Sequence, residues 1–379
     1  MTNTAADYEA VNDGDENDGG LQDEIPSEDQ PAADGELTEE QMRMREFQQH
    51  PINNPAKQIR IWTLPIDDLY RKIKNAVLRR RSGIYVPAAT GDGKTSSIIA
   101  ITKRLRMEFG RIAIVRQSYL VHQQPSVRGF YYQFLETMSG NLKGETSAQR
   151  TRLVNAFLDA ARLAKDDAVY LFIDEAQQMR DMEVGFLKDL YNALELQKVQ
   201  LVTFLFGQNP GLSDAVNGFK NAKREDLVAR FACYDTRLRS FSTLTDITHL
   251  LNQIDCTVDK NGRPYTEFFF PTAYANGYRL VCEASQLYSA MKRVMTGGEQ
   301  YGFPARQVFY AIQDFFAFEL DKDAPDFRGS AKQWDIAVAN SALKAMLNHK
   351  QSTPSACSGL QLALPQTSDS DSPTSAETD

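Results

Sequence analysis

Residues 88–95, Ala-Ala-Thr-Gly-Asp-Gly-Lys-Thr, constrain the fold of this chain more than any other segment. They follow a short apolar run at 83–88 that is typical of a strand, and they open a helical period over 93–109. The order of strand, glycine-rich turn and helix predicts a phosphate-binding loop, with Ala88 where the motif usually has its first glycine. Backbone N–H groups of such a loop turn inward around phosphate oxygens, and the helix N-terminus adds its partial positive charge.

The residue types in this loop predict ATP and Mg²⁺ as cofactors. Lys94 would reach the β- and γ-phosphates, and the Thr95 hydroxyl would coordinate Mg²⁺. A chance match to the motif is the alternative, which the flanking strand and helix disfavour. The predicted nucleotide-binding residues of the loop are Ala88, Ala89, Thr90, Gly91, Asp92, Gly93, Lys94, Thr95 and Ser96.

An acidic pair follows the apolar run at 168–173 and supplies the carboxylates that such a site needs. Asp174 is predicted to hold the metal through water, and Glu175 to polarise the attacking water as general base. The pair could instead begin a helix, with Asp174 as the N-cap before Ala176. The phosphate-binding loop upstream favours the metal and base roles.

The next apolar run, at 200–206, ends in Gly-Gln-Asn. A polar side chain at this edge would lie between the phosphate-binding loop and the acidic pair. Gln208 is therefore predicted to contact the γ-phosphate or the attacking water, and Asn209 is the second candidate. The alternative is a simple turn, because Asn209-Pro210-Gly211 is strong turn chemistry.

Apolar runs alternate with amphipathic helical periods up to about Phe241, and a further run lies at 111–115. Strands that are apolar on both faces and separated by helices predict a mostly parallel sheet covered on both sides. The predicted fold class is therefore α/β, a three-layer P-loop NTPase. After Phe241 the strand-like runs disappear, which predicts a helical lobe. Its helical periods lie at 243–254, 271–295, 304–320 and 330–347.

Two arginines outside the loop could complete the site. Arg230, in the segment EDLVARF, could project toward the nucleotide of a neighbouring copy and stabilise charge on the transferred phosphoryl group. Arg279 follows Gly277 at a predicted helix start and could reach the nucleotide from the helical lobe. Arg224 and Arg237 are the fallback assignments, and an exposed or ion-paired arginine is the ordinary alternative for each of them.

Charge is distributed unevenly along the 379 residues. The 42 basic and 50 acidic side chains give a net charge of −8, yet residues 41–350 hold all 42 bases and only 32 acids, a net of +10. A basic body is compatible with a nucleic-acid partner despite the acidic isoelectric point. We expect a disordered acidic tail at 1–45, an ATPase domain at 46–240, a helical lobe at 241–348 and a disordered Ser/Thr/Pro-rich acidic tail at 349–379.

Composition also bears on location. No stretch approaches the roughly 18 uninterrupted apolar residues of a membrane span, and the acidic N-terminus is unlike a signal peptide. A cytoplasmic protein with no membrane partner is expected. The four cysteines show no C-x-x-C spacing, so neither a zinc ribbon nor a disulfide framework is indicated.

The motifs together resemble a known family. ATGDGKT, LFIDEAQ, LFGQNP, a downstream ARF and GYR at a helix start are similar to those of the AAA+ ATPases. More narrowly, residues from about 50 to 345 resemble the transposition-regulator branch, the TniB/TnsC/MuB type, while IDEAQ and GQNP are also similar to ExeA-type secretion ATPases. The resemblance implies a helical lid and ATP-dependent homo-oligomers, rings or helical filaments. These would assemble on double-stranded DNA and recruit a transposase and target-selection proteins.

DNA contacts in such an oligomer would come from basic residues on its inner surface. Arg116, His122 and Arg128 follow the second predicted strand and could contact phosphates without reading the base sequence. The run at 79–81 is a denser basic cluster, but the C-terminal end of a helix favours cations for dipole reasons alone.

Three classes of function follow from these observations. The first is an ATPase that oligomerises on DNA without sequence specificity, regulates or recruits a transposase and selects target sites. The second is a replication loader or initiator ATPase, which would be expected to carry a winged helix. The third is an ATPase of secretion or signalling type that acts on protein partners. The basic body favours the first.

Overall fold

A computed structural model gives the structure of the chain. It describes residues 37–54, 60–121, 126–138, 140–295 and 302–352, the last five of these by their backbone alone. The chain divides into two units, residues 1–50 and 51–379, and each is described by itself.

The first unit contains helix α1 (Glu39–Gln49). The Thr38 hydroxyl accepts the Gln41 N–H at 3.2 Å, and the Gln41 side chain accepts the Thr38 N–H at 2.9 Å, which is a capping box. Residues 39–45 are therefore helical, although their composition assigned them to the acidic tail. Residues 1–36 of that predicted tail lie outside the described residues. Of the second predicted tail, residues 349–352 are helical, at the end of α15 (Leu343–Ser352), and 353–379 lie outside the described residues.

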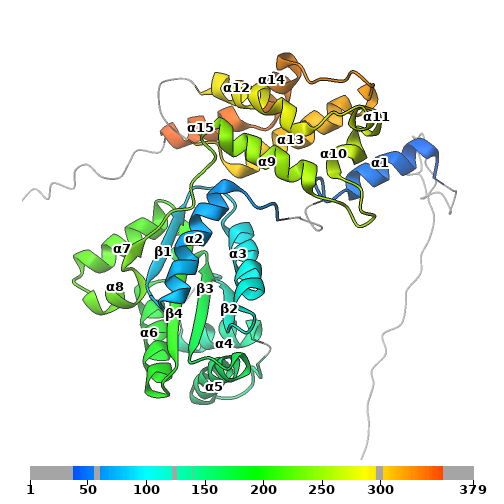
Figure 1. The fold of residues 1–379 in the computed structure, drawn as a ribbon. Helices are drawn as coiled ribbons and strands as arrows, with labels where there is room; N and C mark the ends of the chain where they lie inside the picture. Colours follow the sequence, from blue (N-terminus) through cyan, green and yellow to red (C-terminus); the bar gives the residue numbers. More distant parts are fainter. Residues whose placement is uncertain (1–36, 55–59, 122–125, 139, 296–301, 353–379) are drawn as a thin grey trace, which may run out of the picture. The chain divides into compact units, whose positions relative to one another are not determined.

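The second unit is built on a parallel sheet with the strand order β2-β3-β4-β1-β5 (Figure 1). The strands are β1 (Ile84–Ala88), β2 (Ile114–Ser118), β3 (Ala168–Asp174), β4 (Gln200–Gln208) and β5 (Tyr234–Asp235). β4 lies between β1 and β3, so its carboxyl end lies between the loop after β1 and the acidic pair after β3. The second strand begins at Ile114 rather than at residue 111 and extends to Ser118, which places Arg116 within the strand.

Helices cover both faces of the sheet and produce two hydrophobic cores. Alternate residues of β3 divide between them: Tyr170 and Phe172 face one core, and Val169, Leu171 and Ile173 face the other. The first core contains α2 (Leu64–Leu78) and α3 (Lys94–Phe109). The second contains α4 (Val127–Thr137), α5 (Thr146–Ala164), α6 (Asp181–Leu196), α7 (Gly211–Asn221) and α8 (Glu225–Phe231). These layers confirm the predicted three-layer α/β P-loop NTPase fold.

The chain after Phe241 is helical, as the periodicity predicts. The helical lobe consists of α9 (Leu244–Cys256), α10 (Tyr265–Phe269), α11 (Pro271–Ala275), η3 (Leu280–Glu283), α12 (Ala284–Val294), α13 (Ala305–Glu319), η4 (Leu320–Lys322), α14 (Ala331–Asn340) and α15 (Leu343–Ser352). The helical period at 271–295 is broken into α11, η3 and α12. The break has a local cause, because Gly277 has a φ of +90° and the buried Asp255 carboxylate accepts the N–H groups of Leu280 and Val281 at 2.9 Å each.

None of the helices in the described segments combines the length and the apolar character that crossing a bilayer requires.

Phe204 in β4 tests the core against which α2 and α3 pack. Its ring is fully buried and stacks on Phe172 with a centroid distance of 4.5 Å. Phe204→Ala should lower the free energy of unfolding by about 3–5 kcal/mol, because it removes buried apolar surface and leaves a cavity. Leu163→Ala on α5 is the control: its side chain is 81% exposed, so the change should stay within about 0.5 kcal/mol. Urea unfolding of both variants measures the difference, and equal losses would contradict this description of the core.

Candidate functional site

A cavity of about 600 Å³ lies above the loop that follows β1, and its size is typical of small-molecule sites. The loop at 90–96 lines it, together with residues from 51–66, from α13 and from the ends of β3 and β4. Four residues that the sequence assigned to one site meet here: Lys94, Thr95, Glu175 and Gln208.

The loop has the backbone shape that phosphate binding requires. Gly91 and Gly93 have φ values of +87° and +85°, in the left-handed region that favours glycine. The Asp92 carboxylate braces the loop from within, because it accepts the Ala89 N–H at 3.1 Å and the Ser240 hydroxyl at 2.6 Å. Asp92, a predicted binding residue, thus lines the cavity while its carboxylate holds the loop in shape.

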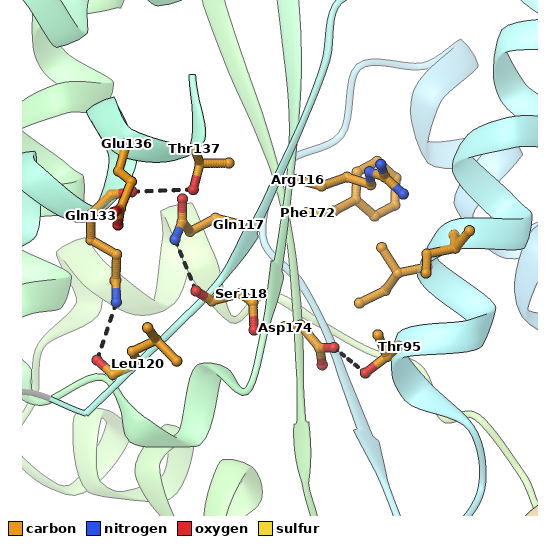
Figure 2. A pocket seen from close by; sticks show the side chains of 12 residues that line it. Thr95, Arg116, Gln117, Ser118, Leu120, Gln133, Glu136, Thr137, Phe172 and Asp174 are labelled. Atoms are coloured by element: carbon orange, nitrogen blue, oxygen red, sulfur yellow. Dashed lines mark hydrogen bonds between the residues drawn. The ribbon is translucent and has the colours of Figure 1, made fainter. Parts of the chain in front are cut away.

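Lys94 and the oxygen pair beside it fit a magnesium–phosphate group. Lys94 forms no ion pair with any carboxylate of the described residues, so its charge is available to an anion. The Thr95 hydroxyl donates to Asp174 Oδ2 at 2.5 Å, which brings two oxygen ligands of the kind Mg²⁺ prefers into contact (Figure 2). Burial raises the pKa of the Asp174 carboxyl, and the Thr95 hydroxyl opposes that shift by stabilising the carboxylate.

Glu175 is joined to the end of β4 by a residue that sequence reasoning did not single out. The Gln177 side-chain amide, in the short helix η2 (Ala176–Gln178), donates to Glu175 Oε2 at 2.6 Å. Its oxygen accepts the Gln208 N–H at 3.0 Å. Glu175 has a φ of +58°, an uncommon conformation for a residue with a side chain. The alternative of a helix N-cap at Asp174 does not describe this segment, because the 3-10 helix begins after Glu175.

The helical lobe does contribute an arginine, but the structure places Arg306 at the cavity and Arg279 elsewhere. The Arg279 guanidinium donates to the carbonyls of Tyr274 and Tyr278 at 3.0 and 2.6 Å and lies 3.6 Å from the Tyr274 ring centroid. Arg306, in the first turn of α13, lines the cavity and donates its backbone N–H to the Gly91 carbonyl at 2.9 Å. Its position had no marker in the sequence apart from its place at a helix start.

Arg230 packs within its own subunit. Its guanidinium donates to the Asp226 carbonyl at 3.1 Å and lies 5.3 Å from the ring centroid of Tyr191 on α6. Of the fallback residues, Arg224 pairs with Asp226 at 3.1 Å, whereas Arg237 is largely exposed and lies 3.9 Å from the Asp235 carboxylate.

One of the candidate DNA contacts, Arg116, lies at a second cavity, of about 480 Å³, that opens beside Thr95 and Asp174 (Figure 2). Arg116 lines this cavity from within β2, where its side chain is exposed. Arg128 is exposed in the first turn of α4, and His122 lies outside the described residues.

Two buried glutamines, Gln117 and Gln133, also line the second cavity. Each donates its side-chain amide to a backbone carbonyl, at 2.9 and 3.3 Å. Their side-chain oxygens are buried and accept no hydrogen bond from the described residues.

The far end of the first cavity is lined by apolar and aromatic side chains that the sequence did not mark. They include Ile52, Ile61, Phe309 and Tyr310, with Gln313 as an amide among them. Gln313 also donates to the Ile52 carbonyl, which ties α13 to the segment before α2. These side chains form an apolar slot, with the amides of Asn54 and Gln313 beside it, which could hold a planar heterocyclic base. These residues come from distant segments with no shared motif, which is why sequence reasoning missed them.

Comparison with known proteins supports the fold. Residues 77–216 match the family described as "AAA domain", and no curated protein sequence matches the chain. The Aeropyrum pernix ORC2 protein, in ADPNP–ADP complexes, has a TM-score of 0.50 and 12% identity, covering 80% of this chain and 74% of that one. The A. pernix ORC1 protein in complex with DNA has a TM-score of 0.44 and 11% identity, with 76% and 68% covered. The likeness to the ORC2 protein shows the shared AAA+ P-loop NTPase fold.

Separate replacement of Arg279 and Arg306 tests which of these two arginines contacts a nucleotide in the first cavity. Arg306→Ala should weaken nucleotide binding about tenfold, the loss of one charge-assisted contact. Arg279→Ala should leave the affinity within about twofold, because its guanidinium is engaged with backbone carbonyls and Tyr274. Titration with a fluorescent ATP analogue measures both. The reverse ranking would place Arg279, and not Arg306, at the phosphates.

Proposed function

We propose that the chain is an ATPase that binds Mg²⁺–ATP in the first cavity and hydrolyses it there. The observation that carries this proposal is the meeting of Lys94, the Thr95–Asp174 oxygen pair and Glu175 at the carboxyl edge of one parallel sheet. Each group matches one requirement of phosphoryl transfer: charge neutralisation, metal binding and activation of water.

The roles of the chain's residues follow from their positions. The loop N–H groups and Lys94 would bind the phosphates, and Thr95 and Asp174 would hold the metal, directly and through water. Bound Mg²⁺ would neutralise charge that develops on the phosphates. Glu175 would accept a proton from the attacking water, and Gln208, which lines the same cavity, would orient that water or the γ-phosphate. Arg306 would contact the phosphates from the helical lobe.

We further propose that this ATPase binds double-stranded DNA without sequence specificity, oligomerises on it and regulates a transposase. The motifs ATGDGKT, LFIDEAQ and LFGQNP, which resemble the transposition-regulator branch, support this reading, and so does the net charge of +10 over residues 41–350. Exposed Arg116 and Arg128 are the candidate phosphate contacts. Arg230 is the candidate contact to a neighbouring subunit's nucleotide, and it would have to leave Tyr191 to make that contact.

Two substitutions separate ATP binding from hydrolysis. Lys94→Ala should abolish nucleotide binding, because it removes the unpaired cation of the loop. Glu175→Gln should keep ATP affinity within about threefold but lower the turnover rate at least a hundredfold, because an amide cannot accept the proton. Lys103→Ala, an exposed lysine on the same helix as Lys94, is the control and should match the wild type in both assays. Phosphate release and nucleotide titration give the two readouts. Rapid turnover by Glu175→Gln would rule out its role as the base.

A mobility assay on duplex DNA with ATP, with ADP and without nucleotide tests the DNA proposal. We expect a shift only with ATP, and one that weakens steeply between low and high salt because bound phosphates release counterions. Arg116→Ala combined with Arg128→Ala should reduce the salt dependence as well as the affinity. ATP hydrolysis without any DNA binding would instead favour an ATPase that acts on protein partners.

A further inference from the structure

One glutamine bridges the two elements on which the proposed hydrolysis depends. Gln177 donates its amide to Glu175 Oε2 at 2.6 Å and accepts the Gln208 N–H at 3.0 Å. We propose that Gln177 is a positioning residue that orients the Glu175 carboxylate and couples it to the end of β4. This inference rests on the proposed function, because it assigns a residue to the same reaction.

The packing around Gln177 shows that the bridge is built into the fold. A Cβ added to Gly207 would lie 2.6 Å from Gln177 Oε1, and one added to Gly211 would lie 3.3 Å from Gln177 Cγ. A side chain at Gly207 would therefore displace the glutamine amide. Gly207 near the end of β4 and Gly211 at the start of α7 thus leave room for this one side chain, which lies half-buried against them.

The chemistry of an amide suits this position. Its N–H₂ occupies one carboxylate oxygen of Glu175 and leaves the other available to a water molecule, while its own oxygen holds the backbone of β4. An amide does not titrate, so Gln177 cannot compete with Glu175 for the proton. A general base oriented by a third group is a recurring arrangement in catalysis. Because β4 also carries Gln208, a shift of this strand end on phosphate contact would move Glu175 with it.

Gln177→Glu tests the bridge with almost no change in shape. The variant keeps an acceptor for the Gln208 N–H but turns a carboxylate oxygen toward Glu175. We expect the turnover number to fall at least tenfold and the KM for ATP to change less than threefold, because the phosphate contacts remain. Two adjacent carboxylates also raise the pKa of one another, so the acid limb of the turnover–pH profile should move to higher pH by about one unit.

Gln178→Glu is the matched control, with the same charge change one residue farther along. It should retain the wild-type turnover and acid limb. Gln177→Met removes both hydrogen bonds without adding charge, and should lower turnover without moving the acid limb. Nucleotide affinity and the melting temperature report whether each variant is folded.

The outcomes separate this inference from the proposed function. If Gln177→Glu is folded and keeps the wild-type turnover and acid limb, Gln177 does not position the base and the inference is overturned. An equal loss in Gln178→Glu would also overturn it, because the effect would then follow charge in the segment and not the bridge. If the wild type binds ATP and never hydrolyses it, with or without DNA, the proposed function itself fails and this inference fails with it.

Discussion

The pairing of β4 between β1 and β3 is the constraint on which the site depends. In a parallel sheet the carboxyl ends of all strands lie at one edge, where ligands bind. The register sets Ala88 beside Gln208 and Ile173 beside Leu205, and the Asn209 N–H continues the ladder to the Ala88 carbonyl at 2.9 Å. The phosphate-binding loop, the acidic pair and the polar end of β4 therefore become neighbours although they lie far apart in sequence.

Contacts between the phosphate-binding loop and the helical lobe form the second constraint. The Gly91 carbonyl accepts the Arg306 N–H, and the Asp92 carboxylate accepts the hydroxyl of Ser240, in the segment that leads to the lobe. A Cβ at Gly302 would lie 2.5 Å from Ser240 Cβ, so the close approach of residue 302 to Ser240 requires a residue without a side chain. The loop and the start of the lobe are thus joined by hydrogen bonds at two points.

Local patterns were sufficient to predict most of the fold and the positions of the loop and the acidic pair at the ends of β1 and β3. Glycines at 91 and 93, a lysine at a helix start and carboxylates at a strand end are requirements of nearby chemistry, so they leave a signature within a few residues. The predicted start of β2 was three residues too early, because the apolar run already includes Ile112 and Ala113, which precede the strand. The period at 271–295 concealed a break, because the break depends on a carboxylate, Asp255, from another helix.

By itself, the sequence determined the α/β fold class, the phosphate-binding loop and the acidic pair, since each depends on neighbours along the chain. Only the tertiary structure decided which lobe arginine reaches the cavity. Arg279 and Arg306 both lie at helix starts. The difference is that the Arg279 guanidinium is held by the carbonyls of Tyr274 and Tyr278, whereas the first turn of α13 is hydrogen-bonded to the Gly91 carbonyl through the Arg306 N–H. The apolar slot and the Gln177 bridge were also visible only in the structure. The bridge joins the segment after β3 to the end of β4, so it depends on the order of the strands in the sheet, which local sequence patterns do not determine.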